Sequence, residues 1–236
     1  MNTPLIIIPA HNEESTIGLV LDDLHRHGYK NILVVDDCSS DNTASLASQK
    51  GAKVMSLAYN LGAWKATQAG LRYAAKMGVF HAVTFDADQQ HLASQIKKLF
   101  THQSKSKKDM IIGSCISRGS FSRHIAWRFF RALSGVSVLD LTSGFRLYNR
   151  KAIEVLSRSE GTLIEYQDVG VLLLLRTFNI SKSEIDVEMQ DRTVGISRIF
   201  YSWWAVLYYM SYTTVLCCSK LAKSNKLLSS SELKDS

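Results

Sequence analysis

Short apolar runs that alternate with helical patterns are the feature that most constrains the fold of this chain. In the runs, β-branched and other apolar residues follow one another without interruption, which is typical of buried strands. Between the runs, apolar residues recur at the spacing of one helix face. The expected strands are 5–8, 32–35, 53–57, 82–85 and 110–113, and the expected helices cover 17–28, the segment through Leu46, 63–77 and the segment around 96–100. Short connections between alternating strands and helices predict a mainly parallel sheet flanked by helices on both faces.

Polar loops follow three of the expected strands, at 9–14, 36–43 and 86–91. Loops at the carboxyl ends of parallel strands meet at one edge of the sheet, where ligands bind. A dehydrogenase-type phosphate loop would place glycines there as G-x-G-x-x-G, and this chain places carboxylates instead. Carboxylates repel a bare diphosphate, but they suit a divalent cation bound between protein and phosphates.

Each loop taken alone supports a simpler interpretation. Asp86 and Asp88 are compatible with a solvated turn or a helix cap, and Asp36 and Asp37 with satisfying backbone donors in a loop. The combination of the loops, in this order after expected strands, is far more specific than any one of them.

The combined motifs resemble the inverting family-2 glycosyltransferases, which have the GT-A nucleotide-diphospho-sugar transferase fold. The resemblance rests on Pro9-Ala10-His11-Asn12-Glu13-Glu14, Asp36-Asp37-x-Ser39-x-Asp41-x-Thr43, Asn60-x-Gly62 and Asp86-Ala87-Asp88-x-Gln90-His91. Two later motifs, Asp140-Leu141-Thr142-Ser143-Gly144-Phe145-Arg146 and Arg192-x-x-Gly195-x-Ser197, are similar to the branch of dolichyl- and polyprenyl-phosphate mannosyl- and glucosyltransferases. The resemblance extends over roughly residues 4 to 200.

The resemblance implies a nucleotide-sugar donor, a GDP- or UDP-sugar, and a Mg²⁺ or Mn²⁺ cofactor. It implies donor-binding roles for Pro9, Asn12 and Glu13 at the nucleoside, Asp37 at the base or ribose, and Asp86, Asp88 and Gln90 at the metal on the diphosphate. It also implies that Arg192 neutralises the leaving nucleoside diphosphate. Ala63-Trp64, after Asn60-Leu61-Gly62, departs from the small residues usual in the family.

The net charge of +7 is concentrated in one part of the sequence. Between 118 and 158 only Asp140 and Glu154 oppose a series of basic residues: Arg118, Arg123, Arg128, Arg131, Arg146, Arg150, Lys151 and Arg158. A phosphate acceptor is already ionised near neutral pH, so it needs cations to position it rather than a base, and arginine does this in a bidentate way. The candidate acceptor-binding residues are Arg118, Arg128 and Arg131, together with Ser143 and Arg146, for which the resemblance implies phosphate contact. The alternatives are a solvated face or contacts with lipid headgroups.

Asp168 precedes a very apolar expected helix at 169–175. In relatives that act on sugar hydroxyls, an Asp in a comparable place is the catalytic base. A helix-capping carboxylate is the other interpretation, because the helix dipole favours an acidic group there.

The segment 199–219 has no charged residue and is followed by lysines. Its Trp and Tyr content, with apolar and tyrosine-rich faces, indicates a helix in the plane of a membrane interface. A helix packed on the enzyme or on a second subunit, and a true membrane span, are the second and third interpretations. The expected organisation is therefore a transferase domain at 1–198, an amphipathic membrane-associated helix at 199–222 and a flexible tail at 223–236.

The predicted function is sugar transfer to a polyprenyl or dolichyl phosphate by a peripheral enzyme on the cytoplasmic face of a membrane. The beginning of the sequence has no signal-peptide pattern, and Cys38, Cys115, Cys217 and Cys218 lack metal-ligand spacing and suit reduced thiols. One rival is transfer to a sugar hydroxyl of a lipid-linked saccharide in cell-surface polysaccharide assembly. Another is a non-catalytic nucleotide-binding subunit of a membrane complex. A membrane subunit or homo-oligomer is a possible partner, and nucleic acid is not expected, because exposed aromatics do not interleave the basic residues.

Overall fold

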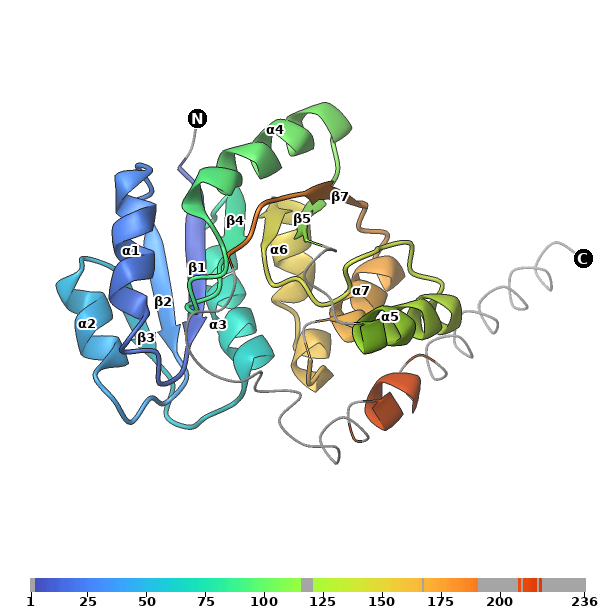
Figure 1. Ribbon diagram of the computed structural model, residues 1–236, viewed down its shortest axis with the longest axis horizontal. Coiled ribbons are helices and arrows are strands. Elements are labelled where there is room, and N and C mark those ends of the chain that lie inside the picture. The colour runs from blue at the N-terminus through green and yellow to red at the C-terminus, as the bar shows by residue number, and fades with distance from the viewer. Residues whose placement is uncertain are drawn as a thin grey trace, which may run out of the picture.

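The computed structural model describes residues 3–115, 121–166, 168–190, 208, 210–215 and 217. In the described part, helices cover both faces of a seven-stranded sheet with the order β3-β2-β1-β4-β6-β5-β7 (Figure 1). The strands are β1 (Leu5–Ala10), β2 (Ile32–Asp36), β3 (Lys53–Ser56), β4 (His81–Thr84), β5 (Met110–Ser114), β6 (Arg146–Asn149) and β7 (Lys182–Asp186). The helices are α1 (Ile17–Arg26), α2 (Thr43–Gln49), α3 (Ala63–Lys76), α4 (Ile96–Ser106), α5 (Phe121–Ser134), α6 (Arg150–Leu156) and α7 (Val169–Thr177), with short 3₁₀ turns η1 (Ala93–Gln95) and η3 (Ser159–Leu163).

The sheet is mainly parallel, as expected. Strand β1 pairs in parallel with β2 and β4, β2 with β3, and β5 with β7. The exception is β6, which is antiparallel to both β4 and β5. Because β6 runs the other way, the loop that leads into it reaches the same edge as the loops that follow β4 and β5.

Alternate residues of the central strands divide the core into two layers. Ile6 and Ile8 of β1 pack with α1, α2 and α4, whereas Ile7 packs with the layer that contains α3, α5, α6 and α7. Helix α3 lies close to β1, because a Cβ added at Gly70 would come within 2.4 Å of the Ile7 side chain. This packing fixes the direction in which α3 leaves the loop that precedes it.

The expected helix at 199–222 lies mostly outside the described residues. Of its described positions, Thr213 and Cys217 are buried. Cys217 belongs to the core layer that contains α3, α5, α6 and α7. The Tyr212 hydroxyl accepts a hydrogen bond from the Glu165 backbone N–H at 3.1 Å, and the Tyr208 hydroxyl donates to the Glu165 carboxylate at 3.1 Å. The described positions Tyr212, Thr213 and Cys217 therefore pack on the enzyme, as in the second interpretation, and the position of the segment at a membrane interface stays a prediction. None of the helices described is long and apolar enough to span a membrane.

Candidate active site

Hydrogen bonds join the loop after β1 to the loop after β2 at the carboxyl edge of the sheet. The Asn12 side-chain oxygen accepts from the Ser40 backbone N–H at 2.8 Å, and the Glu13 backbone N–H donates to the Thr43 hydroxyl at 2.8 Å. Asn12 has a positive φ of 52°, which sets its side chain back towards the neighbouring loop. The structure thus brings the two predicted nucleoside loops together.

Asp37 connects these loops to the turn before α3. Its backbone N–H donates to the Ala10 carbonyl at 2.8 Å, and its carboxylate oxygens accept from the backbone N–H groups of Leu61 and Gly62 at 2.7 and 2.8 Å. Asp37 is 3% exposed. A buried carboxylate between three loops fixes their relative positions, because leaving those N–H groups unpaired would be costly. The expected contact of Asp37 with a base or ribose stays a prediction.

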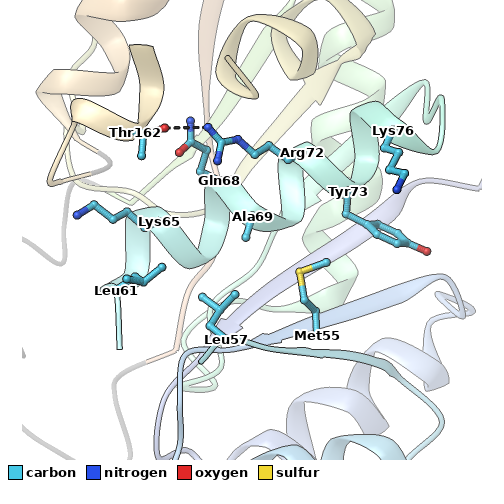
Figure 2. Close-up of a pocket in the computed structure, with 10 residues that line it drawn as sticks. All are labelled: Met55, Leu57, Leu61, Lys65, Gln68, Ala69, Arg72, Tyr73, Lys76 and Thr162. Atoms are coloured by element: carbon cyan, nitrogen blue, oxygen red, sulfur yellow. Dashed lines mark hydrogen bonds between the residues drawn. The ribbon is translucent and has the colours of Figure 1, made fainter. Parts of the chain in front are cut away.

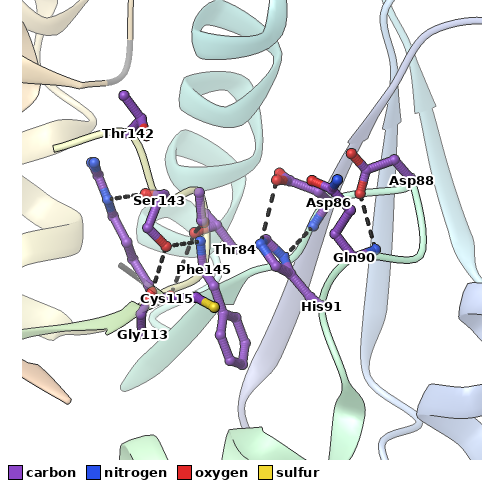
Figure 3. A network of polar contacts seen from close by, with 12 residues as sticks. Thr84, Asp86, Asp88, Gln90, His91, Gly113, Cys115, Thr142, Ser143 and Phe145 are labelled. Atoms are coloured by element: carbon purple, nitrogen blue, oxygen red, sulfur yellow. Dashed lines mark hydrogen bonds and ion pairs between the residues drawn. The ribbon is translucent and has the colours of Figure 1, made fainter. Parts of the chain in front are cut away.

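The loop after β4 carries the candidate metal ligands (Figure 3). Asp86 has a side chain 35% exposed, and the Asp88 carboxylate accepts from the Gln90 backbone N–H at 3.1 Å. Gln89 has a positive φ of 64°, so the chain turns sharply directly after Asp88. Both carboxylates therefore belong to a compact turn at the carboxyl edge of the central strands.

The donor set of this turn fits a hard divalent cation in part. In the portion of the chain that is described, no group of three or more His, Cys, Asp or Glu side chains is arranged to hold a metal. Mg²⁺ in phosphate-transfer sites commonly takes only one or two carboxylates and completes its shell with substrate phosphates and water. Two partly exposed carboxylates are compatible with that mode of binding.

The segment before Arg192 runs beside the loop that carries the candidate metal ligands. The Gln190 backbone N–H donates to the Gln90 carbonyl at 2.9 Å, and Met189 forms an antiparallel bridge with His91. Arg192 itself lies outside the described residues, so its expected role at the leaving diphosphate stays a prediction. The chain nevertheless reaches the loop within two residues of Arg192.

Two predicted acceptor ligands lie at the start of β6: Ser143 is in the loop before the strand, and Arg146 is its first residue. The Ser143 hydroxyl donates to the Gly113 carbonyl at 2.5 Å. The Arg146 guanidinium is buried, with the residue 1% exposed, and donates to the carbonyls of Ser143 at 2.8 Å and Leu141 at 3.3 Å. In this conformation both side chains hold their own loop, and contact with an acceptor phosphate stays a prediction for them.

Asp140 and Glu184 fix the other end of this loop. Glu184, on β7, accepts from the backbone N–H groups of Leu139 and Asp140 at 2.6 and 2.9 Å. The Asp140 carboxylate in turn accepts from the backbone N–H groups of Thr142 and Ser143. Burial, more than the nearby charge of Asp140, raises the pKa of Glu184 above its ordinary value. The carboxylates of Asp140 and Glu184 thus hold the backbone of this loop in place through hydrogen bonds.

Two of the candidate acceptor-binding arginines, Arg128 and Arg131, lie on α5. Arg128 is exposed, and Arg131 is partly exposed and donates to the Leu139 carbonyl at 3.3 Å. That contact places the Arg131 side chain against the start of the loop that contains Ser143. Arg118 lies outside the described residues.

Asp168 is the N-cap of α7, and its carboxylate accepts from the Val169 backbone N–H at 2.8 Å. It is 5% exposed. This is the capping arrangement of the second interpretation, and catalytic-base function stays a prediction.

Sequence patterns alone did not find three of these functions. Asp37 was placed at the site, but its role in joining the turn at 61–62 needs the packed loops. Glu184 has no local signal, because it lies in a polar strand. His91 was part of the matched motif without a role of its own, although its place directly after the carboxylate turn was the available signal.

Residues 5–157, well over half of the chain, match the protein family described as Glycosyl transferase family 2. The chain belongs to this family. The names of two similar curated enzymes include a polyisoprenoid lipid and a phosphate group. The UDP-N-acetylglucosamine–dolichyl-phosphate N-acetylglucosaminyltransferase of Methanococcus voltae is 32% identical over 64% of this chain and 71% of its own length. The polyprenol monophosphomannose synthase of Mycolicibacterium smegmatis is 28% identical over 83% of this chain and 80% of its own length.

Solved structures agree on the GT-A fold. Glucosyl-3-phosphoglycerate synthase from Mycobacterium tuberculosis, in complex with phosphoglyceric acid, matches with a TM-score of 0.69 and 20% identity over 92% of this chain and 79% of that one. The same enzyme has also been solved with Mn²⁺, UDP and glucosyl-3-phosphoglycerate, with a TM-score of 0.65 and 21% identity. The family-2 membership and the fold together establish the chain as a glycosyltransferase.

Proposed function

We propose that this family-2 glycosyltransferase moves a sugar from a nucleotide-sugar donor to a polyprenyl or dolichyl phosphate with the help of Mg²⁺ or Mn²⁺. The observation that carries the proposal is the placement of the Asp86–Asp88 turn at the edge where the joined loops at 9–14 and 36–43 also lie. The dolichyl phosphate in the name of one relative and the polyprenol monophosphomannose in the name of the other support the choice of acceptor.

On the donor side, we assign the nucleoside to the loops of Pro9, Asn12 and Glu13, with Asp37 at their base. Asp86 and Asp88 would hold the cation, with Gln90 beside them, and the cation would neutralise the donor diphosphate and make it a better leaving group. We assign the stabilisation of the departing nucleoside diphosphate to Arg192. The Mn²⁺ and UDP bound by the structural neighbour support this assignment.

On the acceptor side, we assign phosphate contact first to the exposed arginines of α5, Arg128 and Arg131, with Arg118. An ionised phosphate oxygen attacks the anomeric carbon directly, so the protein has only to position it and to exclude water. We assign Ser143 and Arg146 a supporting role: they hold the loop at 139–145, called the acceptor loop below. Their side chains donate hydrogen bonds to backbone carbonyls. Asp168 then has no proton to remove and serves as a helix cap.

We propose that the side of the molecule near the α3 amino terminus faces an anionic bilayer. Leu61 and Lys65 line a shallow groove of about 490 Å³ together with Arg72 and Thr162 (Figure 2). Arg72 donates to the Thr162 hydroxyl at 2.8 Å, which holds the turn that presents Leu163, 83% exposed. Glu160, on the same 3₁₀ turn η3, opposes these cations in part.

Exposed apolar side chains beside lysine and arginine suit the headgroup region of a membrane. Leu163→Asp should lower co-sedimentation with vesicles of phosphatidylcholine and phosphatidylglycerol, and Leu19→Asp, on exposed α1, is the matched control. Unchanged binding of the Leu163 variant would contradict this orientation.

The proposed reaction is tested by a screen of radiolabelled UDP- and GDP-sugars with undecaprenyl or dolichyl phosphate, in Mn²⁺, in Mg²⁺ and in excess chelator. We expect one nucleotide-sugar to label the lipid phosphate only when metal is present. Labelling of a lipid-linked saccharide but of no simple lipid phosphate would favour the rival acceptor, a sugar hydroxyl. Transfer at full rate in chelator would contradict the metal assignment.

A further inference from the structure

His91 contacts the candidate metal ligand Asp86 through both ring nitrogens (Figure 3). Nδ1 lies 2.9 Å from the Asp86 backbone nitrogen, whose N–H donates to it. Nε2 lies 3.4 Å from the Asp86 Oδ2. The side chain is 2% exposed, so water has little access to these contacts.

The hydrogen bond from the Asp86 backbone N–H assigns the tautomer of His91. A backbone N–H can donate only to an unprotonated nitrogen, so Nδ1 carries the lone pair. The proton of the neutral ring is then on Nε2, which faces the Asp86 carboxylate as a donor. One ring therefore fixes both the backbone and the carboxylate of the same residue.

The other side of the His91 ring packs on the acceptor loop. It stacks on Phe145 with the ring centroids 4.9 Å apart and the planes 26° from parallel, and Phe85 meets both rings edge-on. Phe145 has little room to move, because a Cβ added at Gly113 would come within 2.6 Å of its ring. The orientation of His91 is thus set by the loop that also contains Ser143.

We propose that His91 is a positioning residue that orients the Asp86 carboxylate for the divalent cation. It also fixes the position of the loop at 86–91 relative to the loop at 139–145. This inference rests on the proposed function, since it takes Asp86 as a metal ligand. A donor that holds one carboxylate oxygen sets the directions of the remaining lone pairs before the cation arrives. Such partners of metal ligands commonly change metal affinity by about 10- to 100-fold when they are removed.

The experiment compares three substitutions that separate the contacts of the ring. His91→Phe keeps the stacking on Phe145 but loses both polar contacts. In His91→Asn the amide takes the place of Nδ1, and in His91→Gln it takes the place of Nε2. His81→Asn is the matched control, because the His81 ring also meets a phenylalanine edge-on, but His81 is only half-buried and lies at the opposite end of β4.

Mn²⁺ affinity, measured by electron paramagnetic resonance with saturating UDP or GDP, is the readout. Nucleotide affinity without metal and the thermal unfolding midpoint are measured for each variant. We expect His91→Phe and His91→Asn to bind Mn²⁺ about 10- to 100-fold more weakly, and His91→Gln to recover to within about three-fold of the unsubstituted protein. The His81 control should be unchanged, and nucleotide affinity without metal should be the same throughout.

Three outcomes would overturn the inference while leaving the proposed function intact. Unchanged Mn²⁺ affinity in all His91 variants would show that His91 does not orient the metal ligand. An equal loss of affinity in all three would assign the effect to the imidazole ring as a whole rather than to Nε2. Recovery by Asn but not by Gln would assign it to the backbone contact. If the unsubstituted protein binds no Mn²⁺ with either nucleotide, the proposed function fails and this inference fails with it. If His91→Phe does not fold, the comparison of Asn with Gln still decides.

Discussion

The Arg146 guanidinium donates from Nε to the carbonyl oxygen of Ser143 at 2.8 Å, inside the protein. An arginine that the sequence suggested as a phosphate ligand is therefore part of the support of its own loop. The loop in turn contacts the candidate metal loop through the stacking of Phe145 on His91. The acceptor side and the donor side of the site are thus mechanically connected.

Replacing Arg146 should affect both stability and acceptor use. Arg146→Ala leaves the buried carbonyls of Ser143 and Leu141 without their donor, so we expect the free energy of unfolding to fall by about 1.5–3 kcal/mol. Urea denaturation measures this change. Transfer to the lipid phosphate should weaken while donor affinity stays nearly unchanged. Arg131→Ala is the comparison, because it should weaken acceptor use with little loss of stability. A normal unfolding free energy for Arg146→Ala would contradict the supporting role.

Much of the amino-terminal half of the sheet could be predicted from the sequence. The apolar runs at 5–8 and 32–35 became β1 and β2, because uninterrupted β-branched residues are buried on both faces of a parallel sheet. Strand β7 was missed because Lys182–Asp186 is polar and partly exposed at the sheet edge, so it lacks the apolar run of a buried strand. Strand β6 is not predicted, because it is short and begins at Arg146, the last residue of a motif whose pattern indicates a ligand-binding loop.

The contacts within the site were less predictable. Local patterns place residues at strand ends, but they do not say which neighbour a side chain meets. Asp37 meets Leu61 and Gly62 only because β2 and the turn before α3 lie together. Glu184 and Leu139 are far apart in the sequence. They meet because β5 pairs with both β6 and β7, which brings the loop before β6 close to β7.

Glu184 should make stability depend on pH. Burial raises the pKa of Glu184 above the ordinary value of a glutamate, so the native protein binds this proton more tightly than the unfolded chain does. The stability that this proton contributes is fully present below the pKa of Glu184 in the unfolded chain. It is lost as the pH rises through the pKa of Glu184 in the native protein. Relative to Glu184→Gln, the unsubstituted protein should therefore lose unfolding free energy as pH rises from about 4 towards neutrality. Guanidinium denaturation at several pH values measures the difference, and a difference that does not vary with pH would contradict the assignment.

Removing one candidate metal ligand should nearly abolish activity. Asp88→Asn removes a charged ligand from the cation, and the charge stabilisation at stake is several kcal/mol, so transfer should fall by at least roughly a hundred-fold. Asp22→Asn is a matched control, because Asp22 lies on the α1 surface in an ion pair with Lys50 and outside the site. Near-normal transfer by Asp88→Asn would mean that the cation, if it is needed, binds elsewhere.

Asp168→Asn should have little effect on transfer. Asn is as good an N-cap as Asp, so α7 should keep its start and the protein its stability. If the acceptor is an ionised phosphate, no base is lost, and the rate should fall only modestly at unchanged donor affinity. Single-turnover transfer with measured donor affinity tests this expectation. Loss of transfer in this variant, with normal transfer by Arg128→Ala and Arg131→Ala, would assign the acceptor to a sugar hydroxyl.

The most direct test of the central claim compares undecaprenyl phosphate with undecaprenol as acceptors under identical conditions. The two lipids share the same chain and differ only in the phosphate, so the comparison isolates the ionised nucleophile. With Mn²⁺ and the donor found in the screen, we predict that the labelled sugar appears on undecaprenyl phosphate and not on undecaprenol. Equal labelling of both lipids, or labelling of neither while a lipid-linked saccharide is labelled, would contradict transfer to a lipid phosphate.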